Sequence, residues 1–237
     1  WIVDRFDDIK VIRYEVPGFD NLTLKEKEYV YYLSEAAKCG RDILFDQNFK
    51  YNLAVRRTLE KIYTSTTDRE CDDFKAFEKY LKKVWFANGI HHHYSNDKFT
   101  PEFSEAWFRE QLAAYINDDN RQIEDDLLCE IIFNKELYAS RLNQTAGVDV
   151  VKASANNYYE GVSQEEVEAF YAGMVAADAN NPEPISYGLN SKLMRDENGQ
   201  IVERVWKIGG MYSPAIEQIV FWLEKAATVA KGEQKAT

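Results

Sequence analysis

Three consecutive histidines, His91-His92-His93, are the most chemically conspicuous residues of this sequence, and they are all the histidines that it has. A tight zinc site needs ligands that converge on one point, as histidines at positions i and i+4 of a helix do. Three adjacent side chains instead diverge in a strand and spread around most of a turn in a helix. The pattern leaves three roles open: a metal site completed by Asp97 or Glu102, a binding surface, or structural hydrogen bonding. We assign no metal ligand among them.

Known catalytic motifs are absent from the sequence. It contains no HExxH zinc motif, no GxSxG nucleophile elbow, and neither of the GxxxxGK[ST] and GxGxxG phosphate-binding loops. Cys39, Cys71 and Cys129 are far apart, which favours buried thiols over a disulfide framework or a zinc ribbon. Paired carboxylates such as Asp7-Asp8 are neighbours along the chain, so they do not indicate acid–base catalysis across a cleft. We therefore predict no catalytic residue.

The polar segment around the histidines is the best candidate for binding a ligand. Residues 88–95 read NGIHHHYS and combine histidine with tyrosine. Both side chains offer a flat apolar face and a hydrogen-bonding edge, and loops that group them make good ligand contacts.

Composition excludes several classes of protein. The net charge is −11 and Lys and Arg form no cluster, so a nucleic-acid partner is not expected. A hydrophobic content of 45% with 14% aromatic residues argues against disorder. No stretch approaches the roughly 20 apolar residues of a membrane span. We expect a cytoplasmic protein; because the chain opens at Trp1, a removed signal peptide or a periplasmic location stays open.

Local patterns predict an α+β fold that is mostly helical with a small antiparallel β element. Capping boxes at Thr23–Glu26 and Ser163–Glu166 each predict the start of a helix. Asn198-Gly199 predicts a hairpin between residues 185–194 and 201–208. Residues 9–16 and 148–153 are predicted to be extended. Further helices are predicted at 51–63, 74–86 and 104–116, and another after the acidic run 118–126.

A last helix is predicted with Ser213 as its N-cap and Pro214 as its first residue. Its apolar stripe is Ile216, Ile219, Val220, Leu223, Ala227 and Ala230. A change of character divides a helical part, 1–146, from an α+β part, 147–237.

Long strings of the sequence resemble the dipeptidyl peptidase III family of zinc metallopeptidases, in its Bacteroides-type form. They are YYLSEAA at 31–37, GRDILFDQN at 40–48, VWFANGIHHHY at 84–94, SYGLNS at 186–191 and GGMYS at 209–213. Together they span nearly the whole chain.

The resemblance implies an exopeptidase that releases dipeptides from the N-terminus of oligopeptides. The family has two lobes: a helical lobe carries the zinc motif His-Glu-Xaa-Xaa-Gly-His, and a lower lobe with a small β-barrel holds the substrate. Residues 1–237 resemble the N-terminal, substrate-binding contribution to that lower lobe. The zinc motif is absent and would follow Thr237, so we expect this segment to be inactive alone and zinc to belong to the full-length enzyme. The implied partners are oligopeptide substrates and the C-terminal, zinc-carrying part of the same chain.

The resemblance also suggests substrate-binding residues. Tyr94 takes a position where animal members have a phenylalanine that faces the cleft, and His93 lies beside it. Asn157 belongs to a loop that corresponds to an asparagine-containing loop of the family. We therefore expect Tyr94, His93 and Asn157 to contact substrate. The alternative is a non-catalytic module that binds a peptide or another partner.

Overall fold

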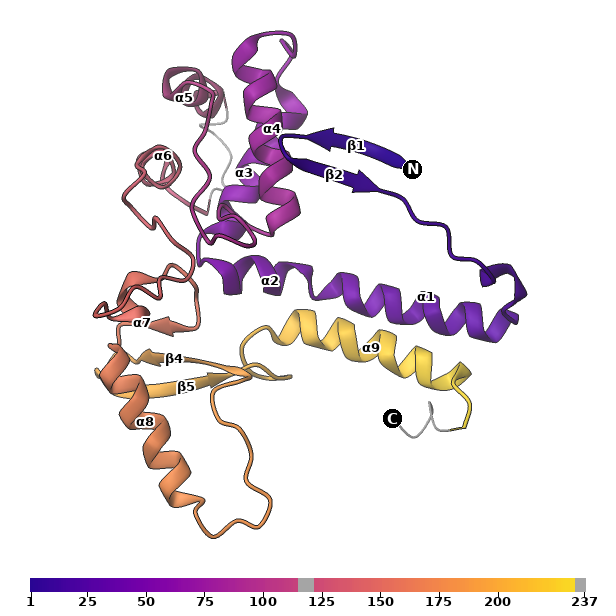
Figure 1. Ribbon diagram of the computed structural model, residues 1–237, viewed down its shortest axis with the longest axis vertical. Helices are drawn as coiled ribbons and strands as arrows, with labels where there is room; N and C mark the ends of the chain where they lie inside the picture. The colour runs from indigo at the N-terminus through magenta and orange to yellow at the C-terminus, as the bar shows by residue number, and fades with distance from the viewer. Residues whose placement is uncertain (115–121, 233–237) are drawn as a thin grey trace. The chain divides into compact units, whose positions relative to one another are not determined.

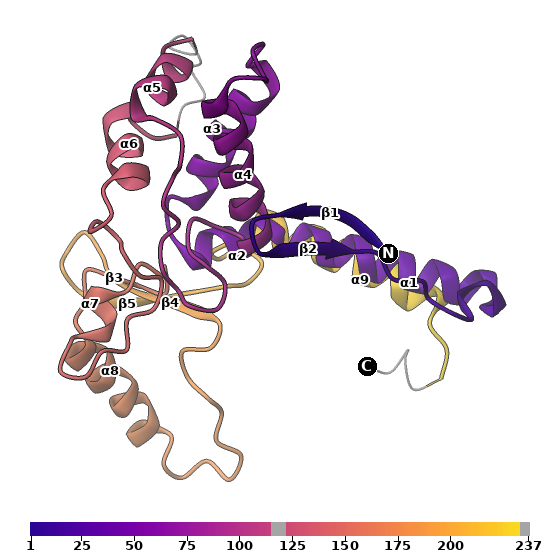
Figure 2. The ribbon, with the colours of Figure 1, turned by 45° about the horizontal axis from the view of Figure 1, so that its top comes forward.

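The computed structural model describes residues 1–114 and 122–232 and confirms an α+β fold in which about half of the chain is helical (Figures 1 and 2). The chain forms two compact units, Trp1–Leu44 with Val205–Thr237 and Phe45–Arg204. The second unit runs across residue 146, where the sequence pattern changes from helical to mixed.

The first unit opens with an antiparallel hairpin. Strand β1 (Ile2–Phe6) pairs with β2 (Ile9–Ile12), and Phe6 lies opposite Ile9. The extended segment predicted over 9–16 is confirmed for Ile9–Ile12, where the strand stops, whereas β1 was not predicted. The tight turn relies on Asp7, whose φ of 52° is a left-handed conformation that Asp tolerates better than most residues.

Two long helices make up most of the first unit. The 3₁₀ turn Phe19–Asn21 precedes α1 (Leu24–Cys39), which begins at the predicted capping box of Thr23 and Glu26. Helix α9 (Ser213–Val229) lies beside α1 and runs in the opposite direction (Figures 1 and 2).

The predicted N-cap of α9 was one residue too late. Tyr212, in a left-handed conformation, is the N-cap, and Ser213 is the first helical residue. The Ser213 hydroxyl instead accepts a hydrogen bond from the amide of Gly209 at 2.7 Å and donates to Glu217. It therefore closes the preceding turn rather than capping the helix.

The second unit begins with helices around an aromatic core. They are α2 (Arg41–Asn48), which enters from the first unit, α3 (Asn52–Ser65), α4 (Asp72–Ala87), α5 (Glu105–Ala113) and α6 (Asp125–Phe133). Helix α3 packs on α4 and α5 on α6, with fully buried Leu59, Phe77 and Phe108 among them. Helix α2 was not predicted. Ser104 caps α5 as predicted, whereas the predicted end at Ile116 and residues 118–121 of the acidic run lie outside the described residues.

A small mixed sheet completes the second unit. Strand β3 (Tyr159–Glu160) pairs in parallel with β4 (Ser191–Arg195), and β4 forms a hairpin with β5 (Ile201–Val205) through a turn in which Gly199 has a φ of 77°. The hairpin is confirmed, with strands shorter than predicted. Helix α8 (Gln164–Ala177) starts at the predicted capping box and packs its Val167 with Leu193.

The prediction of an extended segment at 148–153 was wrong, because Val150–Ala153 forms the short helix α7. Asp149 accepts hydrogen bonds from the amides of Val151 and Lys152, which starts a helical turn despite the run of β-branched residues. Within the described part of the chain, no helix is long and apolar enough to cross a membrane.

Candidate functional site

Asn52, at the start of α3, holds in place the backbone that leads from α4 into the histidine segment. Its side chain is completely buried; Oδ1 accepts a hydrogen bond from the amide of Ile90 at 3.1 Å, and Nδ2 donates to the carbonyl of Phe45 at 3.0 Å. Gly89 lies directly against this amide with a φ of 148°, and a Cβ atom there would come within 2.1 Å of Asn52 Nδ2. Only glycine fits between α4 and the histidines.

The three histidines have three different environments. His91 is buried, and its Nε2 donates a hydrogen bond to the carbonyl of Tyr138 at 2.8 Å. Burial lowers the pKa of His91 to about 4, so it is neutral at pH 7. Nδ1 of His92 accepts hydrogen bonds from the amides of Tyr94 at 3.2 Å and Ser95 at 3.1 Å, which closes the turn that follows. The ring of His93 lies between those of Phe86 and Tyr94, at centroid distances of 5.0 and 4.4 Å.

These environments do not suit zinc, the metal that the resemblance implies. The ring nitrogens of His91 and His92 that have just been described face a carbonyl and two amides, respectively. No group of three His, Cys, Asp or Glu side chains that could hold a metal ion occurs among residues 1–114 and 122–232.

Arg141 joins the turn after the histidines to the loop at Asn156. Its guanidinium donates to Asn96 Oδ1 at 2.8 and 3.0 Å, to Asn48 Oδ1 at 3.1 Å and to the carbonyl of His93 at 3.3 Å. Its own carbonyl accepts hydrogen bonds from the backbone amide and from Nδ2 of Asn156, both at 3.1 Å. Three segments that are distant in the sequence are thereby held at one place.

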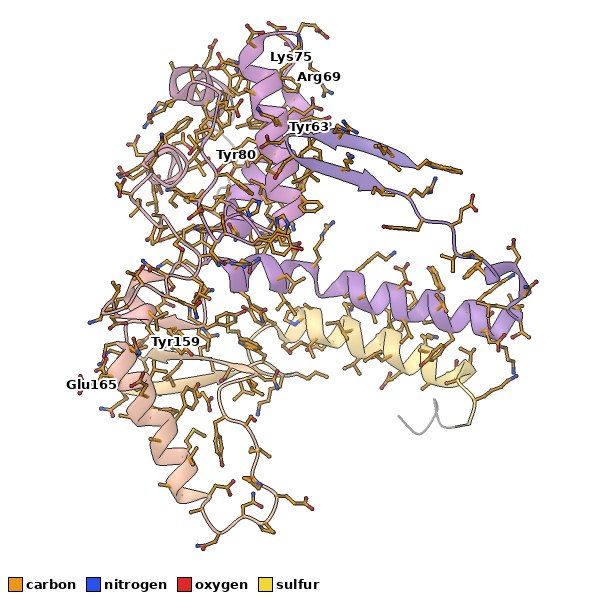
Figure 3. The ribbon with its side chains drawn as sticks, in the orientation of Figure 1. Tyr63, Arg69, Lys75, Tyr80, Tyr159 and Glu165 are labelled. Carbon is orange, nitrogen blue, oxygen red and sulfur yellow. The ribbon has the colours of Figure 1, made fainter. Side chains whose placement is uncertain are left out.

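A pocket of about 450 Å³, here called the Arg141 pocket, opens at this junction. Its polar wall consists of Asn48, Asn96, Arg141 and Asn156, and its apolar wall includes Val151, Tyr158 and Tyr159. A second hollow of about 440 Å³, the Glu160 pocket, shares Val151, Asn156 and Tyr159 with it. Tyr159, labelled in Figure 3, comes from β3, at the edge of the small sheet.

Asn157 lies in the wall of the Glu160 pocket, and its side chain already has partners there. It is 6% exposed; Oδ1 accepts a hydrogen bond from the ammonium of Lys192 at 2.7 Å, and Nδ2 donates to Asp46 at 3.0 Å. Lys192, itself 6% exposed, also contacts Glu160 at 2.5 Å. This hydrogen bond from Lys192, together with the charges of Lys192 and Lys50, holds the pKa of Glu160 below its usual value.

Tyr94 and His93 lie beside the Arg141 pocket. Asn96, from the same turn, lines the pocket itself. The Tyr94 side chain is 84% exposed and rests on the His93 ring. The carbonyl of His93 is therefore bonded directly to Arg141, and the Tyr94 ring is open to solvent.

The Arg141 pocket retains unused hydrogen-bonding capacity. Among the residues that the structure describes, no hydrogen bond uses Asn156 Oδ1 or the hydroxyl of Tyr159. The four hydrogen bonds that the Arg141 guanidinium donates leave one of its five N–H groups unused. Burial raises the pKa of Tyr159, so its hydroxyl is protonated and can donate at neutral pH. The pocket thus offers both donors and acceptors beside an apolar wall.

No family model matches this chain, and no curated protein matches it. Its site must be judged from its own residues. The sequence singled out the Asn156-Asn157 loop and the histidine segment as candidates. It did not single out Arg141, Asn48 or Asn52, because a lone Arg or Asn belongs to no motif.

Proposed function

We propose that this chain is the substrate-binding, N-terminal part of a zinc-dependent dipeptidyl peptidase of the dipeptidyl peptidase III type, and that the Arg141 pocket binds the oligopeptide. The observation that carries the proposal is the open capacity of Asn156, Tyr159 and Arg141. A peptide main chain presents N–H donors and C=O acceptors in alternation, and this pocket offers partners for both.

The size and charge of the pocket support a peptide ligand. A volume of about 450 Å³ lies within the range of small-ligand sites and suits a short stretch of chain rather than a folded partner. The walls combine uncharged amides with tyrosine rings, and Arg141 is the cation among the lining residues. Such a wall favours a main chain with a flat or apolar side chain over a highly charged ligand.

In this proposal the chain positions substrate and other residues break the bond. When bound in the full-length enzyme, zinc would polarise the scissile carbonyl and activate a water molecule. The residues described here would hold the peptide, orient it and exclude water, which lowers the entropic part of the barrier. The small sheet β3–β5 would belong to the β-barrel-containing lower lobe, and the enzyme would act in the cytoplasm.

Tyr94 and His93 extend the proposed site beyond the pocket. The exposed Tyr94 ring offers a stacking face in the same turn as Asn96, which lines the pocket. A peptide long enough to leave the pocket would contact this ring. Tyr94→Ala would then weaken binding of a hexapeptide more than binding of a dipeptide. An equal effect on both would remove Tyr94 from the site.

Calorimetric titration of the 237-residue chain with a tetrapeptide tests the binding role. The matched ligand is the same peptide with its backbone amides methylated, which keeps the side chains and removes the donors. We expect methylation or Asn156→Leu to weaken binding at least about 10-fold, the loss of roughly one hydrogen bond. The exposed Asn180, which follows α8, provides the control Asn180→Leu. Equal affinity for both peptides would contradict main-chain recognition.

The enzymatic part of the proposal is tested separately. These 237 residues should hydrolyse no dipeptidyl-naphthylamide substrate, with or without zinc. The sequence encoded after Thr237 should contain His-Glu-Xaa-Xaa-Gly-His. Zinc-dependent turnover by the isolated chain, or a stop codon at that point, would contradict the assignment and favour a non-catalytic binding module.

A further inference from the structure

The Glu160 pocket carries more positive than negative charge. Its charged lining residues are Lys50, Lys152 and Glu160. The ammonium of the buried Lys192 contacts Glu160 Oε2 at 2.5 Å, and the Lys50 ammonium lies 3.7 Å from Oε1. Three lysines therefore accompany one carboxylate at this pocket, and the excess of positive charge favours a negatively charged ligand.

The fold brings these charges together from separate segments of the second unit. Glu160 lies opposite Met194 in the ladder of β3 and β4, and side chains two residues apart on a strand share a face. Lys192 is therefore on the same face of the small sheet as Glu160. Lys152 belongs to α7, which lies beside this sheet in Figures 1 and 2, and Lys50 comes just after α2. The charge excess thus belongs to the folded pocket and not to a run of lysines along the chain.

The Lys152 ammonium is available to a ligand. Among residues 1–114 and 122–232, no hydrogen bond or ion pair uses its Nζ atom. Asp149, the nearest carboxylate along the chain, accepts hydrogen bonds from the amides of Val151 and Lys152, both at 3.0 Å, and does not line the pocket. Asp46 also lies outside the lining and accepts a hydrogen bond from Asn157 Nδ2 at 3.0 Å. Neither carboxylate takes the place of a ligand within the pocket.

Glu160 alone would suggest the opposite ligand, the free ammonium of a peptide. Each of its carboxylate oxygens already faces a lysine ammonium, however, at 2.5 and 3.7 Å. A further ammonium would meet the like charges of Lys50 and Lys152 in a partly enclosed site, where repulsion is stronger than in water. A carboxylate would instead be attracted by both lysines. The pocket therefore favours an anionic end group over a cationic one.

The Glu160 pocket adjoins the Arg141 pocket. Val151, Asn156 and Tyr159 line both of them, and Figure 3 labels Tyr159. A peptide main chain bound in the Arg141 pocket can therefore continue into the Glu160 pocket without leaving the protein surface.

We propose, on the basis of the peptide-binding function proposed above, that the Glu160 pocket binds the free C-terminal carboxylate of the oligopeptide. Lys50 and Lys152 pair with this carboxylate, because hydrogen bonds between charged groups are stronger than those between neutral groups. The rest of the peptide then leads back through the Arg141 pocket toward its N-terminus. The ligands of this site are therefore oligopeptides with a free C-terminus, and not internal segments of a longer chain.

The apolar part of the Glu160 pocket selects the last side chain of the peptide. Phe49, Tyr138 and Val162 line it beside the charged groups. A volume of about 440 Å³ accommodates an aromatic or aliphatic side chain together with the carboxylate. We expect a peptide that ends in phenylalanine to bind more tightly than one that ends in aspartate.

Calorimetric titration of the 237-residue chain with two forms of one tetrapeptide, three alanines followed by phenylalanine, tests the role of the carboxylate. The free acid should bind at least about 10-fold more tightly than the C-terminal amide, which keeps the main chain and side chains but loses the charge. Raising sodium chloride from about 50 to 500 mM should weaken binding of the acid and leave the amide nearly unchanged, because salt screens charge pairs.

Substitution of the two lysines tests their assignment. The double variant Lys50→Met, Lys152→Met should bring the affinities of acid and amide to within about 2-fold of each other. The matched control is Lys135→Met, an exposed lysine of the same unit that lines neither pocket, and it should keep the full difference. All three lysines are exposed, so the variants should fold, as circular dichroism would verify. A double variant that keeps the full difference would overturn the proposal.

Glu160→Gln separates a bound carboxylate from a bound ammonium. Glutamine keeps an acceptor for Lys192 and removes the negative charge, so the affinity for the free acid should rise about 3-fold. A pocket that held the ammonium of the peptide would respond in the opposite way. Weaker binding after this substitution and after N-terminal acetylation of the peptide would therefore overturn the proposal.

The same titrations separate carboxylate binding from the proposed function. Equal affinity for acid and amide would overturn carboxylate binding and leave main-chain recognition in the Arg141 pocket standing. If neither tetrapeptide bound, the proposed function would fail, and N-acetylphenylalanine would then probe the Glu160 pocket alone by nuclear magnetic resonance. Shifts at residues 151–162 with this acid but not with its amide would support the carboxylate site, and absence of shifts would overturn it as well.

Discussion

The guanidinium of Arg141 donates two hydrogen bonds to Oδ1 of Asn96, from Nη2 at 2.8 Å and from Nε at 3.0 Å. These bonds tie the turn that carries His93 and Tyr94 to the segment that leads to Asn156. The wall of the Arg141 pocket therefore depends on one planar, five-donor side chain.

Arg141→Lys should loosen this junction, because an ammonium group keeps the charge but cannot satisfy Asn96, Asn48 and the His93 carbonyl in one plane. We expect a loss of about 1–3 kcal/mol in unfolding free energy and faster amide exchange over residues 91–96. Peptide affinity should fall at least about 10-fold.

Arg109→Lys is the matched control. Arg109 forms exposed ion pairs with Glu105 and Asp126, both at 2.8 Å, and solvent screening leaves such pairs little effect on stability. Equal effects of the two substitutions on peptide affinity would show that Arg141 acts only as a charge.

Asn157→Ala should destabilise the fold more than it weakens peptide binding. The substitution removes one hydrogen-bond partner of the buried Lys192 ammonium and leaves Glu160, at a cost of about 1.5–3 kcal/mol in the free energy of denaturant unfolding. Asn156→Ala, one residue earlier, should cost less stability and more affinity, because Asn156 lines the pocket and no described hydrogen bond uses its Oδ1. The opposite ranking would restore Asn157 as a direct substrate contact.

Gly89→Ala should be severely destabilising, by more than about 3 kcal/mol, because it combines a φ of 148° with a clash against the buried Asn52 amide. Gly147→Ala shares a positive φ, 80°, but meets no atom within 4 Å, and should cost only about 1 kcal/mol. Comparing the thermal unfolding of the Gly89→Ala and Gly147→Ala variants separates the effect of the clash from that of the backbone strain. Similar losses would mean that Asn52 moves aside.

Stability should fall with pH between about 6.5 and 4 because of His91. Burial lowers its folded pKa to about 4 from an ordinary 6.5, so in this window the unfolded chain binds the proton and the folded chain does not. Above pH 6.5 the protonation of His91 does not lower the free energy of unfolding. By pH 4 it lowers that free energy by on the order of 3 kcal/mol.

His91→Gln, which keeps a donor for the Tyr138 carbonyl, should flatten the pH dependence between 6.5 and 4.5. Below about pH 4.5 a separate loss should appear in both proteins, because the lowered pKa of Glu160 stabilises the fold only while that carboxylate is charged. An unchanged slope in the variant above pH 4.5 would exclude His91 as its source.

The sequence predicted the elements whose signals are local. The capping boxes at Thr23 and Ser163 and the turn at Asn198-Gly199 act through neighbouring residues, and all three were found in place. Helix α7 was missed because the side chain of Asp149 overrides the β-preference of two valines.

The site was harder to predict, because its geometry comes from distant parts of the chain. Arg141 meets Asn48 across 93 residues, and Asn157 meets Asp46 across 111. Neither separation leaves a pattern along the sequence. The buried face of α9 was misassigned for a similar reason: two apolar stripes fit its sequence, and only contact with α1 decides which one is buried.

The most direct test of the account is a nuclear magnetic resonance titration of the isotope-labelled chain with an oligopeptide, following backbone and side-chain amides together. The account predicts that the largest shifts occur at the Asn156 side-chain amide, the Arg141 guanidinium and Tyr159, which line one pocket. Absence of shifts at a saturating peptide concentration, or shifts confined to residues outside the Arg141 and Glu160 pockets, would contradict it.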